Sequence, residues 1–310
     1  MPATPLPTHL STHARSAAHA NHPHCPCEAT TLADRPDATV VRHGDTVAKA
    51  HAPGTTLSDL SPRVAVAARL TGILLPPLTP EPGILDGRPV TFWPYGTPVD
   101  PDDPDAAPWE AAATLLAHLH RTPPPLTLPA MRGPAKAARA LAALDAIPHP
   151  ATPHLLRAWA ALPAWARAEA PQPDRTTLCH GDLHLGQLVR HPAPDGPWLL
   201  IDVDDLGTGV PAWDLARPAA WYACGLLAPE EWARFLSAYR EAGGPAVPAT
   251  GDPWPALDIP ARALTVQTAA RSIVKAHARS RPLDEVELSV IDACVRMAST
   301  APELTQDHAE

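Results

Sequence analysis

The sequence is poor in lysine, in cysteine and in long apolar runs, and each scarcity argues against a class of protein. Only three lysines occur among 310 residues, and the formal net charge of −9 argues against nucleic acid and anionic membranes as partners. Five scattered cysteines argue against a disulfide framework and predict a reducing compartment, which we take to be the cytoplasm. No apolar run approaches the roughly 20 residues that span a bilayer, and the N-terminus lacks the basic and apolar blocks of a secretory signal.

The rest of the composition is that of a globular protein. Hydrophobic residues make up 45% of the chain and charged residues 18%, and 310 residues are enough to bury a core in one large domain or in two lobes. Proline is abundant, with 42 residues, which predicts short helices and stiff connections.

The most informative stretch runs from Cys179 to Ala216 and places two acidic clusters beside apolar residues. Asp182 follows an apolar run that ends at Cys179, and Asp202 follows a second one at Trp198–Ile201. The turn residues of the segment 194–197 predict a β-hairpin with carboxylates at its mouth. Buried flanks would hold these carboxylates still.

Carboxylates held in this way can bind Mg²⁺ or accept a proton from a hydroxyl group. Asp182 is a candidate base, and the amide oxygen of Gln187 and the carboxylate of Asp202 are candidate Mg²⁺ ligands. Phosphoryl transfer needs little more at its centre, since positioning and electrostatics do most of the work. Asp204 and Asp205 either belong to the site or face solvent at the end of a strand.

Three motif blocks in this stretch carry a resemblance. His-Gly-Asp-Leu-His-Leu-Gly-Gln over 180–187, Ile-Asp-Val-Asp-Asp over 201–205 and Gly-Val-Pro-Ala-Trp-Asp-Leu-Ala over 209–216 resemble the aminoglycoside phosphotransferase family of small-molecule kinases. The first block is similar to the maltokinase branch in particular, because Gln187 stands where the family usually has Asn.

The resemblance implies an α+β fold of the protein-kinase-like two-lobe type, with a small N-terminal β-sheet lobe and a larger, mostly helical C-terminal lobe. It implies that Asp182 is the catalytic base, that Gln187 and Asp202 bind Mg²⁺, and that Asp214 braces the catalytic loop. It also implies an ATP-dependent transfer of the γ-phosphate to a hydroxyl of a small molecule, either aminoglycoside-like or a sugar.

Lys49 is the candidate partner of the ATP phosphates. It lies on the second strand of a hairpin predicted over 38–51, and Gly-Asp-Thr-Val-Ala-Lys over 44–49 resembles the family's ATP-lysine strand. The alternative is an edge-strand lysine that discourages aggregation. Further on, Trp93 and Tyr95 lie where the family's hinge meets adenine, although an ordinary strand exit explains this segment equally well.

Two departures from the family pattern leave other functions open. No glutamate lies between Lys49 and Pro80, and the helix predicted over 62–70 carries Arg63 where such a glutamate is expected. No glycine-rich loop precedes the first strand. The alternatives are therefore a nucleotide-binding pseudokinase without transfer activity, or a kinase for a non-sugar amino alcohol.

The expected organisation is a poorly ordered tail over 1–29, a nucleotide-binding lobe over 30–95, a catalytic and acceptor-binding lobe over 96–300 and a frayed tail over 301–310. Beyond residue 108 the pattern is helical, and the acceptor is expected to contact the C-terminal helices. Helices are expected over 137–144, 155–168, 213–226, 229–241, 260–278 and 284–297. Cys25 and Cys27 lack the second ligand pair of a zinc pattern, so the first tail is not predicted to bind metal. The sequence indicates no oligomeric state.

Overall fold

The structure is a computed structural model that describes residues 6–19, 27–125 and 127–300. The chain forms two compact units, the first comprising residues 1–108, 125–129 and 185–204 and the second the remaining residues. The first unit extends past the expected boundary at residue 95 and takes in the segment 185–204, because strand β6 (Thr97–Pro98) pairs with strand β8 (Leu188–Arg190) inside it. The tail expected over 301–310 lies outside the described residues.

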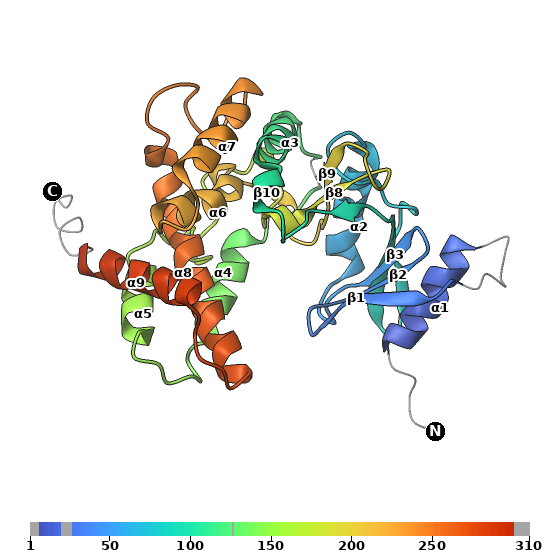
Figure 1. Cartoon of the computed structure of the whole chain (residues 1–310), viewed down its shortest axis with the longest axis horizontal. Helices are drawn as coiled ribbons and strands as arrows, with labels where there is room; N and C mark the ends of the chain where they lie inside the picture. The colour runs from blue at the N-terminus through green and yellow to red at the C-terminus, as the bar shows by residue number, and fades with distance from the viewer. Residues whose placement is uncertain (1–5, 20–26, 126, 301–310) are drawn as a thin grey trace. The chain divides into compact units, whose positions relative to one another are not determined.

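An antiparallel sheet forms the centre of the first unit (Figure 1). Its strands, in spatial order, are β1 (Ala29–Arg35), β2 (Ala38–His43), β3 (Thr46–Ala50), β5 (Arg88–Pro94) and β4 (Gly83–Leu85). The predicted hairpin is confirmed as β2 and β3, which turn at Gly44 with φ of +57°, a conformation that glycine adopts without strain.

The two faces of this sheet have different roles. Successive residues of a strand point to opposite faces, and cross-strand partners share a face. Ala48 and Ala50 are fully buried and join Val41 and Val90 in one apolar cluster. Lys49 therefore points to the other face, where its cross-strand partner is Thr91.

The segment expected to be a poorly ordered tail contains helix α1 (Leu6–Ala18), so the prediction is wrong for these residues. Leu10 and Ala14 are fully buried and extend the apolar cluster of the sheet. The sequence signal was weak because three apolar residues at i, i+4 and i+8 stand among threonine, serine and histidine. Packing against the sheet supplies the stability that the local sequence lacks.

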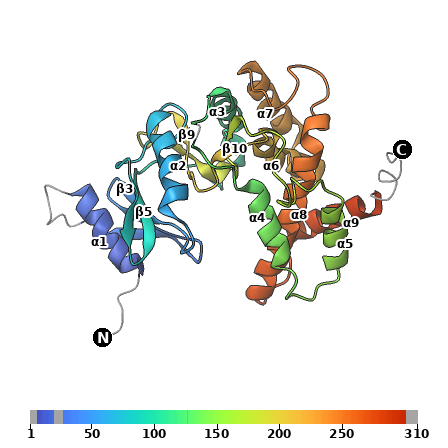
Figure 2. The ribbon, with the colours of Figure 1, turned by 180° about the vertical axis from the view of Figure 1, so that it is seen from behind.

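Helix α2 (Leu57–Arg69) lies on the other side of the sheet from α1 (Figures 1 and 2). It begins five residues before the expected helix, because the Thr56 side chain caps it by accepting a hydrogen bond from the backbone N–H of Asp59 at 3.2 Å. Arg63 is buried in this helix and donates to the carbonyl of Asp59.

The predicted β-hairpin at the acidic stretch is formed by β8 (Leu188–Arg190) and β9 (Trp198–Leu200), which β6 (Thr97–Pro98) extends into a three-stranded sheet. The earlier apolar run, β7 (Thr177–Cys179), is not part of this hairpin. It belongs to the second unit and pairs with β10 (Gly207–Gly209).

Helices make up most of the second unit. They are α3 (Trp109–Arg121), α4 (Gly133–Ala142), α5 (Thr152–Ala160), α6 (Ala212–Ala223), α7 (Pro229–Glu241), α8 (Trp254–Ala278) and α9 (Glu285–Thr300). The helical interpretation of the sequence is confirmed for each, but two helices differ in length from the expectation. Helix α5 ends at Ala160 rather than at residue 168. Helix α8 begins six residues before the expected start at Pro260, which the structure places inside the helix.

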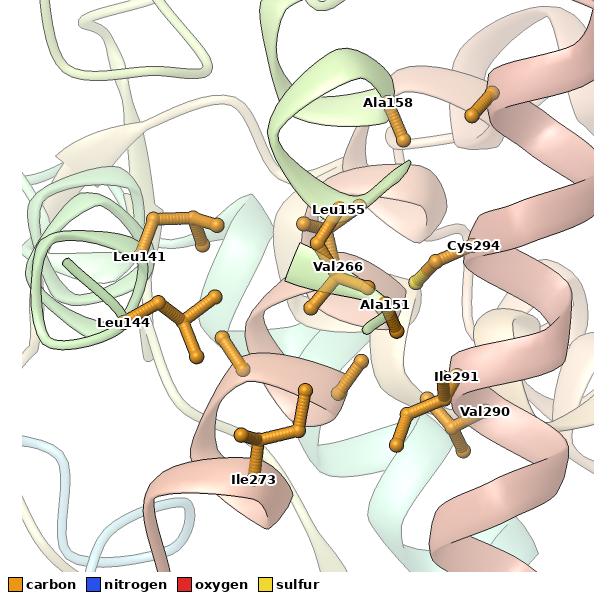
Figure 3. Packing of buried hydrophobic residues seen from close by; sticks show 13 residues of the cluster. Leu141, Leu144, Ala151, Leu155, Ala158, Val266, Ile273, Val290, Ile291 and Cys294 are labelled. Carbon is orange, nitrogen blue, oxygen red and sulfur yellow. The ribbon is translucent and has the colours of Figure 1, made fainter. Parts of the chain in front are cut away.

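Helices α4, α5, α8 and α9 share an apolar core (Figure 3). Leu155 of α5, Val266 of α8 and Ile291 of α9 are almost completely buried there, and Cys294 is buried with them as a small apolar side chain. Burial raises the pKa of the Cys294 thiol to about 12, so it does not act as a thiolate. Among the described residues, no helix has the length and apolar character needed to cross a membrane.

Candidate functional site

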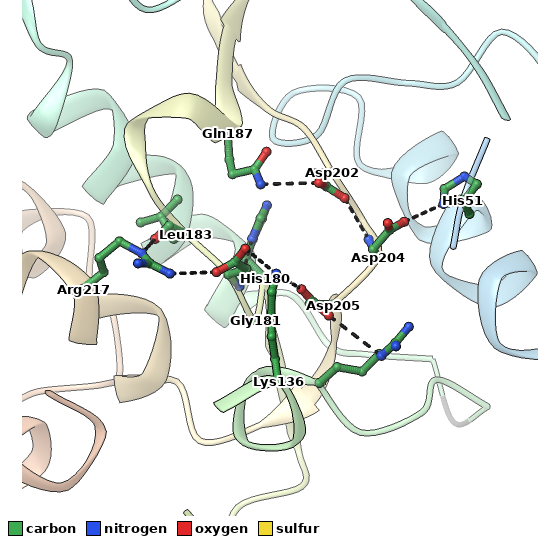
Figure 4. Close-up of polar contacts among 12 residues, drawn as sticks. His51, Lys136, His180, Gly181, Leu183, Gln187, Asp202, Asp204, Asp205 and Arg217 are labelled. Atoms are coloured by element: carbon green, nitrogen blue, oxygen red, sulfur yellow. Dashed lines mark hydrogen bonds and ion pairs between the residues drawn. The ribbon is translucent and has the colours of Figure 1, made fainter. Parts of the chain in front are cut away.

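The first cluster of candidate side chains lies in the first unit, around Lys49, and Figure 4 shows its members His51, Gln187, Asp202 and Asp204. The ammonium Nζ lies 2.7 Å from Oδ1 of Asp202 and 3.0 Å from Oδ2 of Asp204. Burial disfavours the ammonium charge, but the two carboxylates outweigh this effect and raise the pKa of Lys49 above its ordinary value. Lys49 is thus a fixed positive charge, and its partners come from the segment after β9.

Asp202 owes its position to an unusual backbone. Its φ is +68°, in the left-handed region that aspartate tolerates better than most residues. Oδ1 accepts from the backbone N–H of Asp204 at 3.2 Å, the bond of an Asx turn, so Asp202 is both a turn residue and the partner of Lys49. Its second oxygen, Oδ2, accepts from Nε2 of Gln187 at 3.4 Å. The structure thus brings Lys49, Gln187 and Asp202 together, and their roles toward ATP and Mg²⁺ stay predictions.

A directed chain of hydrogen bonds holds Asp204. Carboxylate oxygens only accept, so Nδ1 of His51 donates to Oδ1 of Asp204 at 2.7 Å. In the neutral imidazole the other nitrogen, Nε2, then accepts from the hydroxyl of Thr91 at 2.8 Å. The Thr91 oxygen in turn accepts from the indole N–H of Trp93 at 2.8 Å. Burial favours a neutral Asp204, but Lys49 and then His51 hold its pKa well below the ordinary value.

Trp93 and Tyr95, the predicted nucleotide contacts, are engaged inside the first unit. The Trp93 side chain is buried and donates to Thr91. The guanidinium of Arg42 lies over the ring of Tyr95. The backbone N–H of Tyr95 donates to the carbonyl of Asp45, and the backbone carbonyl of Tyr95 contacts the ring of His191. Their nucleotide roles stay predictions.

The second cluster lies in the second unit, around Asp182. Its Oδ2 lies 2.6 Å from Nζ of Lys136, and its Oδ1 lies 2.8 Å from Nη2 of Arg217. Burial raises the pKa of a carboxyl group, but Lys136 and Arg217 together lower the pKa of Asp182 below its ordinary value. Asp182 is therefore ionised, and each of its two carboxylate oxygens is held by one cation.

Asp214 holds the loop that carries Asp182. From the first turn of α6, its two carboxylate oxygens accept from the backbone N–H groups of His180 at 2.6 Å and Gly181 at 2.7 Å, which confirms the expected brace. Gly181 has φ of +87°, and a Cβ atom there would lie 2.3 Å from the carbonyl oxygen of Asp205. Only glycine fits this position without displacing the loop.

Asp214 is itself held by a second directed chain. His120 donates from Nε2 to Asp214 at 3.0 Å, and its Nδ1 contacts the Tyr239 hydroxyl at 2.7 Å. The hydroxyl oxygen accepts from the backbone N–H of Ala246 at 3.0 Å. His120 is buried and holds Asp214 in position.

Two functional cations were missed from the sequence. Lys136 lies on α4 and bonds Asp205 at 2.7 Å as well as Asp182, and Arg217 lies on α6. Lys136 is one of only three lysines, and the scarcity that singled out Lys49 was also a signal for Lys136. No motif marked Arg217. Its guanidinium also donates from Nε to the carbonyl of Leu183, which ties α6 to the catalytic loop.

Several solved structures have a fold similar to that of this chain. A choline/ethanolamine kinase family protein from Mesorhizobium loti has a TM-score of 0.57 at 17% identity, over 97% of this chain and 96% of its own. Spectinomycin phosphotransferase, solved with ADP and spectinomycin, has a TM-score of 0.57 at 13% identity over 88% and 92% of the two chains. A choline kinase from Streptococcus pneumoniae gives 0.57 at 13% identity over 88% and 93%.

These likenesses confirm the predicted α+β, protein-kinase-like fold, with an antiparallel sheet in one unit and helices in the other. The finer resemblance to the maltokinase branch is not confirmed. No curated protein matches the chain in sequence. The family model described as "Phosphotransferase enzyme family" matches residues 29–254, which is most of the chain and contains both clusters. The chain belongs to the phosphotransferase enzyme family.

Proposed function

We propose that this protein transfers the γ-phosphoryl group of ATP to a hydroxyl group of a small molecule. The observation that carries the proposal is the state of Asp182, an ionised carboxylate on a loop braced by Asp214 in a family of phosphotransferases. The acceptor oxygen forms a bond to phosphorus, the bond from phosphorus to the bridging oxygen of ADP breaks, and the hydroxyl proton is released.

Asp182 orients the acceptor hydroxyl and takes its proton. The two cations that lower its pKa also make it a weak base at neutral pH. A weak base suits a loose transition state, in which the acceptor proton becomes acidic only once the oxygen bonds to phosphorus. Lys136 and Arg217 each hold one oxygen of the Asp182 carboxylate, so they fix the orientation of this carboxylate toward the acceptor hydroxyl.

Lys49 binds the ATP phosphates, with Trp93 and Tyr95 on the nucleotide side. A compact ammonium, ionised and held by two carboxylates, is suited to a phosphate oxygen. The expected glutamate partner is replaced here by Asp202 and Asp204, with His51 behind Asp204. This replacement supports an active kinase over a pseudokinase, because the lysine keeps ionic partners.

The residues near Lys49 also fit a Mg²⁺ ion. Asp202 offers carboxylate oxygens and Gln187 an amide oxygen, the hard donors that Mg²⁺ prefers, and their side chains are in contact at 3.4 Å. Asp202 and Gln187 would hold the ion, which when bound neutralises charge on the phosphates.

An acceptor screen tests the proposal. ADP release is measured with ATP and Mg²⁺ over aminoglycosides, free sugars and amino alcohols such as choline, because solved proteins of similar fold include choline kinases. We expect at least one acceptor to support turnover, and Asp182→Ala to lower kcat by a factor of about 10² to 10⁴. ATP binding, measured by calorimetry, should persist in this variant.

Other outcomes would change the assignment. ATP binding without transfer to any acceptor would support the pseudokinase alternative. Turnover that Asp182→Ala does not reduce would remove the proposed base. ADP release that occurs only with amino alcohols would support the alternative of a kinase for a non-sugar amino alcohol.

A further inference from the structure

Three metal-ligating side chains meet in the first unit, away from Lys49. They are His19, Cys27 and His43, and their donor atoms all lie within 4.8 Å of one another. On β2, His43 shares a face with Val41, which belongs to the apolar cluster under α1. Lys49 is paired with Val40 and so points to the opposite face, which separates this group from the proposed phosphate site.

The fold brings the three residues together from three separate places. His19 follows the end of α1, where its N–H donates to the carbonyl of Arg15 at 2.9 Å. Cys27 precedes β1, whose first residue, Ala29, is the cross-strand partner of His43. This explains why the sequence did not reveal the group, because Cys27 finds its histidine partners at distances of 8 and 16 residues rather than in a local motif.

The contacts are close and centred on the sulfur. Nε2 of His19 lies 2.9 Å from Sγ of Cys27, and Nε2 of His43 lies 3.4 Å from the same atom. Zn–N bonds of about 2.0–2.1 Å and Zn–S bonds of about 2.3 Å imply N···S separations of roughly 3.6 Å around a tetrahedral ion. The His43 contact is close to this value, and His19, which is only half-buried, needs a small outward movement.

His43 is prepared as a ligand. Its Nε2 is the nitrogen that faces Sγ of Cys27, and it is therefore the nitrogen that would bind the ion. A neutral imidazole is the form that binds metal.

The oxidation state of Cys27 decides whether the set is complete. Cys27 is held in a disulfide, and only a thiolate is a metal ligand. Reduction by a thiol or phosphine adds two electrons and two protons to the disulfide and gives two thiols. Binding of the Cys27 thiol to a metal then releases its proton to solvent.

We propose that, in the reduced protein, His19, Cys27 and His43 bind one Zn²⁺ ion that ties the end of α1 to strands β1 and β2. One thiolate and two imidazoles are a donor set typical of zinc, and three protein ligands leave a fourth position for water or another ligand. Oxidation of Cys27 disassembles the site.

The test is zinc binding by the full-length chain without nucleotide. The reduced protein, under argon, is titrated against a chromophoric chelator, and Co²⁺ is used as a spectroscopic replacement. We expect one equivalent of Zn²⁺, a thiolate-to-cobalt charge-transfer absorption, and a rise in melting temperature with Zn²⁺. The oxidised protein should show no charge-transfer band.

Variants separate this site from adventitious binding. Cys27→Ser and His19→Gln should each weaken Zn²⁺ binding by about 100-fold or more, since replacing a residue that only hydrogen-bonds to a metal ligand already costs about 10- to 100-fold. The matched control is His13→Gln, an exposed histidine of α1, which should bind like the unmodified chain. Circular dichroism without metal checks that each variant is folded.

Two results would overturn the proposal. One is a reduced protein that binds no Zn²⁺ at micromolar concentration. The other is a folded Cys27→Ser or His19→Gln variant that binds Zn²⁺ as tightly as His13→Gln.

Discussion

Nδ1 of His51 donates to Oδ1 of Asp204 across 2.7 Å, and the other oxygen of the same carboxylate lies 3.0 Å from Nζ of Lys49. The side chain of His51 is 1% exposed, so this hydrogen bond is protected from water. Asp204 has a fixed orientation because one of its oxygens faces a donor that cannot move. A buried histidine therefore helps to position the lysine that we assign to the ATP phosphates.

The first prediction concerns His51→Leu. Hydrogen bonds to charged groups contribute about 1.5–3 kcal/mol, so we expect the KM for ATP to rise about tenfold or more. We expect a smaller change in kcat, because Asp182 belongs to the other cluster. Initial rates against ATP concentration and calorimetric ATP binding measure the two effects.

The control is His118→Leu, at an exposed histidine of α3, which should leave the KM for ATP unchanged. The double variant Asp204→Asn, His51→Leu should raise the KM for ATP by less than the product of the two single-variant increases, since both residues belong to one chain of hydrogen bonds. A normal KM for ATP in folded His51→Leu would contradict the positioning role.

The second prediction concerns Lys136→Gln and pH. Lys136 is one of two cations that lower the pKa of Asp182, so its removal should raise that pKa. Because Asp182 acts in the ionised form, the acidic limb of kcat/KM should move to higher pH, and the loss of activity should be larger at low pH than at neutral pH.

Lys275→Gln is the matched control, because Lys275 is the exposed lysine of α8. This substitution should not shift the acidic limb of the kcat/KM profile. An equal loss at every pH in Lys136→Gln would mean that Lys136 acts by some means other than the charge on Asp182.

The third prediction concerns His184, two residues after the proposed base. Burial, and then the charge of Arg217, lowers the pKa of His184 to about 4. The imidazole is therefore neutral above about pH 5. We expect His184→Gln to leave the shape of the kcat/KM profile between pH 5 and 8 unchanged, as measured with a three-component buffer. If the unmodified protein showed a limb of the kcat/KM profile near pH 6 and this limb disappeared in His184→Gln, the conclusion that His184 is neutral above about pH 5 would be wrong.

Local patterns in the sequence predicted the parts of the site that lie on one element. Lys49 could be placed on a strand because apolar and polar residues alternate around it, and Asp182 and Asp202 because each follows an apolar run. Helix α7 begins and ends at the expected residues, Pro229 and Glu241, because a proline and two acidic residues mark its first turn.

The partners of these residues could not be predicted, since they depend on how distant elements pack. Thr91 faces His51 only because β5 pairs with β3 in a particular register. Lys136 reaches Asp182 over 46 residues of sequence, and no periodicity reports such a contact. The absence of a glutamate on α2 was noticed in the sequence, but the pairing of Lys49 with Asp202 and Asp204 required coordinates.

The fourth prediction concerns Gly181→Ala. A Cβ atom at this position would lie 2.3 Å from the carbonyl oxygen of Asp205, and the residue has φ of +87°. We expect the loop to move away from Asp214 and kcat/KM to fall by about 10²-fold or more, the effect of roughly 1 Å misplacement of reacting groups. Rates and urea denaturation measure the two consequences.

Gly225→Ala is its control, because Gly225 has φ of +74° but no atom within 4 Å of the added Cβ. It should lose about 1–2 kcal/mol of stability from backbone strain alone and keep its kcat/KM. If both variants kept full activity, the close approach of Gly181 to Asp205 would not be needed for catalysis.

The fifth prediction compares two neighbouring leucines of α5. Leu155 is fully buried in the core that α5 shares with α4, α8 and α9, whereas Leu156 is 41% exposed (Figure 3). Leu155→Ala should lower the free energy of unfolding by about 2–5 kcal/mol, because it removes buried methyl groups and leaves a cavity. Leu156→Ala should change it by less than about 0.5 kcal/mol. Urea denaturation of both variants measures the difference, and equal losses would mean that the α5 face toward this core is assigned wrongly.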